Sequence, residues 1–190
     1  MPILAPESDI YPADLFDIAE QGSAASTWWA LYTLSRREKT LMRHLVSLEA
    51  PFYCPIIPKR QRSPNGRVRT SHVPLFSNYV FLYGDETQRY QAVSTGCVSQ
   101  HIQVVDGAEL GRDLRQICEL IEAGVPLTPE ARLVPGEYVR VRTGPFAGYE
   151  GTVIRRQGQT RLLVSVNFLQ QGASVVLEDC QLESLGKPSE

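Results

Sequence analysis

The chain has 190 residues, of which 43% are hydrophobic and 21% charged, and its 19 Lys+Arg and 21 Asp+Glu give a formal net charge of -2. This composition is typical of a soluble protein of one or two domains, and it argues against a chain that coats nucleic acid over its whole surface. The longest uncharged apolar run, residues 52–57, is far shorter than the roughly 18 residues that a membrane-spanning helix requires. No basic residue precedes Arg36, so the positive start of a secretory signal is missing and we expect a cytoplasmic protein.

The cysteines and histidines do not form a recognisable cofactor or metal site. Cys54, Cys97, Cys118 and Cys180 stand far apart, with no C-x-x-C spacing and no histidine at the spacing of a zinc ligand. We therefore expect buried, reduced thiols. The chain has 3 histidines, which is little material for a triad or a metal cluster. The sequence predicts no catalytic residue, no metal and no cofactor.

The N-terminal residues 1–27 mix Pro, Ala, Ser and acidic residues without a sustained period. This pattern predicts a mobile acidic arm, with room for a short helix over residues 13–20. Residues 28–34 follow, and their aromatic and β-favouring side chains are typical of a strand buried on at least one face. We expect the ordered fold to begin there.

The next segment changes to a helical period. Leu41, Leu45 and Leu48 recur on one face, and Pro51 ends the pattern, so the sequence predicts an amphipathic helix from Arg36 onward. Residues 52–57 and 73–83 are predicted strands. Between them, Pro64-Asn65-Gly66 favours a turn of a loop or hairpin, because Asn-Gly tolerates positive φ angles.

Two more helices follow. Asp85 is placed to cap a helix that runs to about Ser94, and a short strand is expected over residues 102–105. The second helix has the clearest pattern in the chain. Its apolar stripe consists of Leu110, Leu114, Ile117 and Ile121. The order of elements predicts an α+β fold, with helices packed on an antiparallel or mixed sheet.

The last third of the chain has a different character. Residues 125–132 hold two prolines and no period, which predicts a linker. Residues 133–185 contain short strands separated by glycine turns, the pattern of a small all-β barrel, and residues 186–190 form a tail. Because the predicted strands are rich in β-branched residues, we expect a constitutive barrel and not a helical hairpin.

Motifs in the first predicted domain resemble a known family. Trp-Trp-Ala-Leu-Tyr at residues 28–32, Arg-Arg-Glu-Lys at residues 36–39 and Pro-Leu-Phe-Ser-Asn-Tyr-Val-Phe-Leu at residues 74–82 resemble the N-terminal (NGN) domain of NusG-family transcription elongation factors. Within that family the last motif looks closer to specialised paralogues of the RfaH and UpxY kind than to housekeeping NusG. It differs from their usual pattern in having Ser77 in place of a proline, which would stiffen the turn.

The second predicted domain resembles the KOW motif of the same family. It has Pro-Gly-Glu-Tyr-Val-Arg-Val at residues 135–141, Gly-Pro-Phe-Ala-Gly at residues 144–148 and Gly-Thr-Val at residues 151–153. The resemblance implies an NGN-type α/β sandwich over residues 28–124 and a KOW (SH3-like) barrel over residues 133–185. It also implies a monomeric transcription elongation or antitermination factor that suppresses pausing or termination, at specific operons for the specialised paralogues.

The resemblance implies that an aromatic patch grips the clamp helices of the largest RNA polymerase subunit. The corresponding side chains are Tyr32, Phe76, Tyr79 and Phe81. Aromatic anchors suit this task because they supply large contact areas at a low cost in conformational entropy. Strand alternation puts Tyr79 and Phe81 on one face but does not say whether that face is exposed. Packing in the core is the competing interpretation, and we expect at least two of the four rings to reach the interface.

Positive charge gathers in two places, which the resemblance connects with upstream DNA or the displaced non-template strand. Residues 59–72 include several cations and no acid, and further cations follow the first strand. The positions that match those of sequence-reading paralogues are Arg36, Arg37, His44, Ser94 and Thr95. Solvated surface charge is the simpler interpretation of both clusters. Phosphate contacts would give salt-dependent affinity without base readout.

The KOW domain of the family binds a second partner, either a small-subunit ribosomal protein or the termination factor Rho. The corresponding residues are Phe168 and Leu169, with Phe146 nearby. The family's Gly-Arg after this position is replaced by Gln170-Gln171, so the choice of partner stays open.

Two other functions compete with the polymerase-binding factor. A ribosome- or RNA-binding KOW module would need a basic barrel, but residues 133–185 hold as many acids as Arg and Lys. An enzyme would need an activated nucleophile, and the carboxylates of Glu137, Glu150 and Glu178 stand in no such motif. We therefore expect a protein that is not an enzyme.

Overall fold

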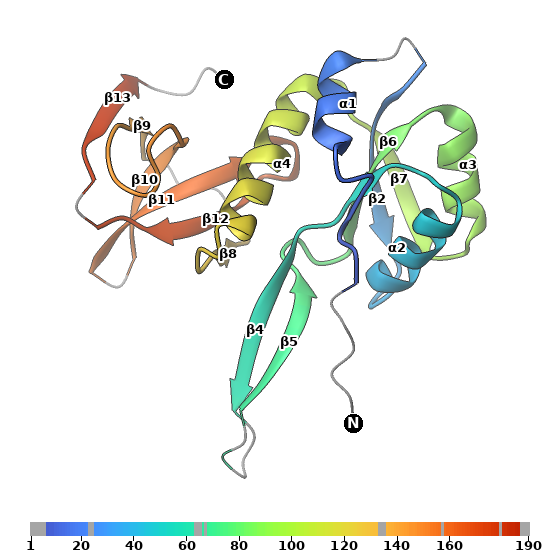
Figure 1. Cartoon of the computed structure of the whole chain (residues 1–190), viewed down its shortest axis with the longest axis horizontal. Coiled ribbons are helices and arrows are strands. Elements are labelled where there is room, and N and C mark those ends of the chain that lie inside the picture. Colours follow the sequence, from blue (N-terminus) through green and yellow to red (C-terminus); the bar gives the residue numbers. More distant parts are fainter. Residues whose placement is uncertain are drawn as a thin grey trace. The chain divides into compact units, whose positions relative to one another are not determined.

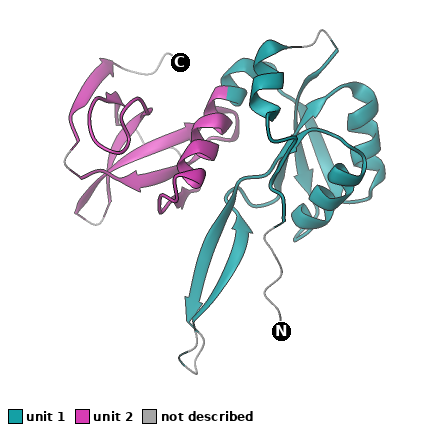
Figure 2. Cartoon of the chain, viewed as in Figure 1, with its two compact units in different colours: residues 1–111 teal, residues 112–190 magenta. Residues whose placement is uncertain are grey.

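The structure is a computed structural model, and it describes residues 7–22, 25–62, 66, 68–132, 136–156, 158–178 and 180–186 (Figure 1). The helices are α1 (Leu15–Gln21), α2 (Glu38–Ser47), α3 (Glu86–Ser94) and α4 (Gly107–Glu122), with a 3-10 turn η1 (Asn167–Leu169). The strands are β1 (Ile10–Tyr11), β2 (Thr27–Thr33), β3 (Phe52–Tyr53), β4 (Ile56–Arg62), β5 (Val68–Pro74), β6 (Tyr79–Gly84), β7 (Val98–Gln103), β8 (Thr128–Glu130), β9 (Glu137–Val141), β10 (Glu150–Arg156), β11 (Gln159–Val166), β12 (Gln171–Val176) and β13 (Leu182–Gly186). The fold is α+β, as the sequence predicts. It divides into two compact units, residues 1–111 and 112–190 (Figure 2).

Unit 1 is built on a five-stranded sheet of order β1-β3-β6-β2-β7. All of its strand pairs are antiparallel, so of the two predicted sheet types it has the antiparallel one. The central strands β2 and β6 pair from Thr27↔Gly84 to Tyr32↔Tyr79. This register matters for the site, because it brings two tyrosines opposite each other at one end of the sheet.

One face of this sheet is covered by α2 and α3. Leu31 and Leu82 from the sheet join Leu41 and Leu45 from α2 in one buried cluster, to which α3 contributes Ala92. The predicted cap of α3 is confirmed, since the Asp85 carboxylate accepts the Gln88 N–H at 2.8 Å. The i, i+4 leucine spacing in the sequence therefore marks the face of α2 that packs on the sheet.

The opposite face is covered in part by the N-terminal segment, which the sequence predicts to be a mobile arm. β1 pairs with β3, and Leu15 of α1 is fully buried. The Phe16 ring lies 5.3 Å from that of Tyr53 and 6.3 Å from that of Trp28, measured between centroids. The segment from β1 to α1 is thus part of the fold. Its elements are too short to give the sequence a sustained period.

Two of the predicted strands are interrupted. The segment 52–57 divides at Cys54-Pro55 into β3 and β4, and the segment 73–83 divides at a turn over residues 75–78 into β5 and β6. β4 and β5 form a separate two-stranded sheet, which projects from unit 1 (Figure 1). The expected turn residues Pro64 and Asn65 lie outside the described residues.

Unit 2 contains the predicted all-β region. Its six strands form an antiparallel sheet of order β13-β9-β10-β11-β12-β8. Val139, Leu162, Val164 and Val175 are among its buried side chains. As expected from its β-branched residues, this region consists of strands and not of a helical hairpin.

The predicted linker contains a strand of this sheet. β8 pairs with β12, with Thr128 opposite Ser174. Arg161 links the two strands by hydrogen bonds, from Nη2 to Thr128 Oγ1 at 2.7 Å and from Nε to Ser174 Oγ at 2.9 Å. The Ser174 hydroxyl in turn donates to Glu130 Oε1 at 2.8 Å. A three-residue edge strand with a central proline has no sequence period, which is why the pattern resembles a linker.

Candidate protein and nucleic-acid interfaces

A pair of tyrosines lies at one end of the unit 1 sheet. Tyr32 near the end of β2 and Tyr79 at the start of β6 are direct cross-strand partners. Their rings meet edge to face with centroids 5.2 Å apart, and both side chains are partly exposed. We call Tyr32 and Tyr79 the tyrosine pair. It presents aromatic surface to solvent from a position that the strand register fixes.

The two phenylalanines of the predicted patch support this pair from inside. Phe76 is 1% exposed and Phe81 is fully buried. Phe81 stacks on Tyr79 with centroids 6.5 Å apart, and Phe76 meets Phe81 edge to face at 6.4 Å. Phe81 is buried because it lies two residues further along a central strand, between β2 and β3. Of the four predicted rings, the tyrosine pair is at the surface and the two phenylalanines are in the core.

The turn between β5 and β6 keeps a defined geometry with Ser77 in place of the family's proline. Asn78 has a φ of 67°, which an asparagine tolerates better than most residues. Its N–H donates to Glu38 Oε1 at 2.9 Å, its carbonyl accepts the Thr33 N–H at 2.8 Å, and its side-chain amide lies 3.4 Å from the Tyr32 hydroxyl. Glu38 therefore fixes the backbone next to the tyrosine pair.

Glu38 is a supporting residue that sequence reasoning missed. Its side chain is 8% exposed, although glutamate is rarely buried without a partner. The residue it holds is 40 positions away in the sequence. Nothing in the local pattern points to that contact, since an acid in the first turn of a helix is ordinarily explained by the helix dipole.

The predicted nucleic-acid residues lie mainly on two neighbouring turns. Arg36 and Arg37 are exposed in the turn between β2 and α2. Leu34 N–H, in the same turn, donates to the Cys97 carbonyl at 2.9 Å, which places this turn beside the one that follows Ser94 and Thr95. The structure thus brings these two turns together.

The position of His44 and the hydrogen bonds of Ser94 and Thr95 fit a nucleic-acid site less well. His44 is exposed near the end of α2, about two helical turns beyond Arg37. The Ser94 hydroxyl donates to the Tyr90 carbonyl at 2.8 Å and the Thr95 hydroxyl to the Ala92 carbonyl at 2.7 Å. Both hydroxyls donate their proton to backbone carbonyls at the end of α3, so each can only accept a hydrogen bond from a ligand.

In unit 2, the predicted partner residues differ in exposure. Phe168 is 36% exposed and Leu169 is partly buried, both on η1. Phe146 is 8% exposed and lies in the interior, so it supports the unit from within. The left-handed Gln170, with a φ of 52°, turns the chain from η1 into β12. Only Phe168 offers substantial aromatic surface.

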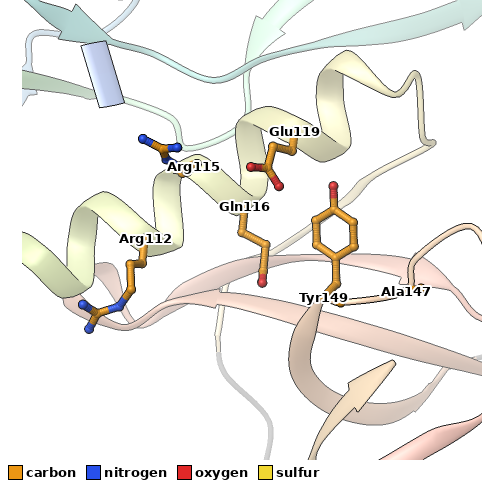
Figure 3. Close-up of a pocket in the computed structure, with 7 residues that line it drawn as sticks. Arg112, Arg115, Gln116, Glu119, Ala147 and Tyr149 are labelled. Carbon is orange, nitrogen blue, oxygen red and sulfur yellow. The ribbon is translucent and has the colours of Figure 1, made fainter. Parts of the chain in front are cut away.

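A pocket of about 350 Å³ in unit 2 lies between α4 and the loop before β10 (Figure 3). Gln116 and Glu150 exchange two hydrogen bonds, Gln116 Nε2 to the Glu150 carbonyl at 2.8 Å and the Glu150 N–H to Gln116 Oε1 at 3.2 Å. Burial, and then the adjacent Glu119 carboxylate, raise the pKa of Tyr149. In Figure 3 the Arg112 and Arg115 side chains point away from Tyr149. The pocket therefore gathers no set of groups suited to catalysis.

Neither a metal centre nor a membrane span emerges from the described parts of the chain. Among those residues no cluster of three or more His, Cys, Asp or Glu could hold a metal ion. No helix there is long and apolar enough to cross a membrane. Burial raises the pKa of the Cys54 thiol, which keeps it protonated and unreactive.

Comparison with known proteins decides the family. A family model described as "Transcription termination factor nusG" matches residues 26–126, more than half of the chain. The chain belongs to the NusG family. A model of the KOW motif matches residues 135–167. The chain is also 26% identical over 180 residues to the transcription termination/antitermination protein NusG of Pseudomonas aeruginosa, a match that covers 85% of this chain and 99% of that protein.

Membership of the NusG family confirms the resemblance carried by the two sequence motifs. It identifies the protein as a transcription factor and not an enzyme. The matched regions include β2 to α4 in the first case and β9 to β11 in the second. The tyrosine pair and the turns with Arg36 and Ser94 all lie within the NusG match.

Proposed function

We propose that this protein is a transcription elongation and antitermination factor that binds RNA polymerase through the tyrosine pair. The observation that carries the proposal is the geometry of Tyr32 and Tyr79, two partly exposed aromatic rings in contact at a sheet end. Interface energy concentrates in such aromatic anchors when their positions are fixed before binding. Here β-sheet register, the Phe81 ring and the Glu38-held turn all fix them.

The expected partner surface is the pair of clamp helices of the largest polymerase subunit, and the expected effect is suppression of pausing or termination. A bound factor of this kind would act in the cytoplasm, where its polymerase works. Residues 74–79, apart from Ser77 in place of the usual proline, favour a specialised factor that serves specific operons over a general one.

The turns around Arg36 and Ser94 suit a contact with upstream or non-template DNA near the same polymerase. Arg36 and Arg37 supply two exposed cations, and Ser94 and Thr95 supply hydroxyl oxygens beside them. His44 lies on α2, the helix that follows the turn with Arg36 and Arg37. Cations would dominate such a contact through phosphates, which position a protein without reading the bases.

Unit 2 would engage a second partner through η1. Phe168 is the exposed aromatic residue there, with Leu169 beside it and Phe146 packed inside. A small-subunit ribosomal protein or the termination factor Rho is the expected ligand. Loss of one of these interactions in a Phe168→Ala variant would identify which partner is bound.

The polymerase proposal is tested by retention of the purified protein on RNA polymerase from its own host. We expect wild-type protein to be retained and a Tyr32→Ala plus Tyr79→Ala variant to bind at least about thirtyfold more weakly, since a strong anchor contributes about 2 kcal/mol or more. Tyr90→Ala is the matched control, because Tyr90 is 65% exposed on α3, away from the pair.

Circular dichroism would establish that the variants are folded. Equal retention of the double variant and wild type would refute the role of the tyrosine pair. If folded wild-type protein did not bind polymerase at all, the proposed function would fall, and ribosomes or free RNA would be the next ligands to examine.

A further inference from the structure

Asn78 lies beside the tyrosine pair with both of its backbone polar groups bonded inside the protein. Its N–H donates to the buried Glu38 carboxylate at 2.9 Å, and its carbonyl accepts the Thr33 N–H at 2.8 Å. Its φ of 67° is a left-handed conformation that asparagine tolerates better than most residues. Two contacts far apart in the sequence therefore fix the backbone from which the Asn78 side chain extends.

The side-chain amide of Asn78 uses the Tyr32 hydroxyl as an acceptor. Asn78 Nδ2 donates to the Tyr32 Oη at 3.4 Å. A phenol hydroxyl can accept hydrogen bonds and also donate its single proton. Because the amide N–H occupies an acceptor position of the oxygen, the Tyr32 proton remains available to another group. An amide turned the other way would present its oxygen and consume that proton.

The Tyr32 proton needs an acceptor once a partner covers the tyrosine pair. Tyr32 is partly exposed in the free protein, so water can accept its proton there. The Tyr32 and Tyr79 rings lie 5.2 Å apart, so a partner that contacts one ring removes water from the neighbourhood of both. A buried hydroxyl without an acceptor is costly in free energy. A partner that binds tightly therefore has to present an oxygen opposite Tyr32.

We propose that Tyr32 donates a hydrogen bond to a side-chain oxygen of the polymerase, and that Asn78 is the positioning residue that keeps this proton available. The proposal rests on the proposed function, in which the partner surface is a pair of helices. Carbonyls within a helix already accept the N–H groups of their own helix. The acceptor is therefore a carboxylate or carboxamide oxygen. Such a contact gives specificity, because a surface that lacks the acceptor leaves the Tyr32 hydroxyl unsatisfied.

The donor role is tested by titrating the fluorescently labelled full chain with RNA polymerase from its own host. Tyr32→Phe keeps the aromatic ring and removes only the hydroxyl. We expect it to bind roughly three- to tenfold more weakly than wild type, which is the size of one lost neutral hydrogen bond. Tyr90→Phe is the matched control, because it removes a hydroxyl from a ring that is 65% exposed on α3. It should bind as wild type does.

The role of Asn78 is tested by Asn78→Asp, which has nearly the same shape and also tolerates a positive φ. The substitution replaces the amide donor by an acceptor, which takes the Tyr32 proton away from the partner. We expect a loss of affinity similar to that of Tyr32→Phe. The added charge near Glu38 is a second effect of this change. The double variant Tyr32→Phe plus Asn78→Asp separates the two effects, because without the hydroxyl there is no proton to capture.

The double variant should bind about as tightly as Tyr32→Phe alone. Additive losses would show that Asn78→Asp acts through its charge, which would overturn the role of Asn78. Wild-type affinity of Tyr32→Phe would overturn the donor role, and wild-type affinity of Asn78→Asp would overturn the orientation of the amide. In each of these cases Tyr32→Ala plus Tyr79→Ala would still weaken binding. The proposed function fails separately, if that variant binds as wild type does or if wild-type protein does not bind.

Discussion

Arginines have different roles in the six-stranded sheet of unit 2 and in the two-stranded sheet of β4 and β5, which we call the β4–β5 ribbon. In the sheet, Arg140 donates to Glu150 at 2.8 Å and Arg142 to Glu183 at 3.1 Å. Arg161 holds three acceptors on β8 and β12. In the ribbon, Arg60 and Arg62 have no acid within the same segment. The first group joins strands of the fold, and the second is available to a partner.

Charge counts from a sequence therefore do not locate a binding surface. A basic residue contributes to external affinity only when no internal carboxylate neutralises it, and that depends on strand register. Glu150 meets Arg140 because β9 and β10 pair them directly. No acid stands opposite any cation of the ribbon.

Among the substitutions that test this difference between the two groups of arginines, Arg161→Ala should have the largest effect on stability. Arg161→Ala removes the donors to Ser174 and Thr128, leaving the fully buried Ser174 short of a partner and β8 loosely held. We expect a loss of about 1–3 kcal/mol in the free energy of unfolding, since hydrogen bonds to charged groups and buried unsatisfied groups have costs of this size. Urea unfolding of the full chain measures it. An unchanged midpoint and slope would show that the network does not stabilise the sheet.

A smaller effect is expected at Arg140. Its ion pair with Glu150 is partly exposed, with 45% and 32% of the two side chains accessible. Solvent screening makes such exposed pairs weak. Arg140→Ala should therefore lower the unfolding midpoint slightly, and 1 M NaCl should remove most of the difference from wild type. A loss as large as that of Arg161→Ala would contradict this ranking.

The smallest effect on stability is expected in the ribbon. The combined Arg60→Ala and Arg62→Ala variant should unfold within about 0.5 kcal/mol per substitution of wild type, as exposed residues without partners do. The same denaturant titration measures it. If the variant were clearly destabilised, its arginines would have an internal role, and the contrast with the C-terminal sheet would disappear.

Much of the fold is predictable because its longer elements carry their own period. Leu41 and Leu45 mark the buried face of α2, and Asp85 marks the start of α3. β1 and β8, with two and three residues, are too short to show a period. They are ordered by pairing with strands far away in the sequence, and local patterns do not contain that information.

The candidate site was predictable only in part for a similar reason. Alternation correctly places Tyr79 and Phe81 on one face of β6. The burial of Phe81 depends on its neighbours across the sheet, Ala30 and Tyr53. The partner of Glu38 depends on a turn formed much later in the chain. Sequence thus identified the aromatic cluster, whereas tertiary packing determines which of its rings are exposed.

The packing of the N-terminal segment has a practical consequence for anyone who expresses unit 1 alone. The NusG match begins at residue 26, and a fragment cut there would lack β1 and α1. β3 would then become an open sheet edge, and Trp28 and Tyr53 would lose the cover of Phe16. Open edges and uncovered aromatic surface favour self-association. A fragment that begins before Ile10 should remain monodisperse at concentrations where the shorter one precipitates.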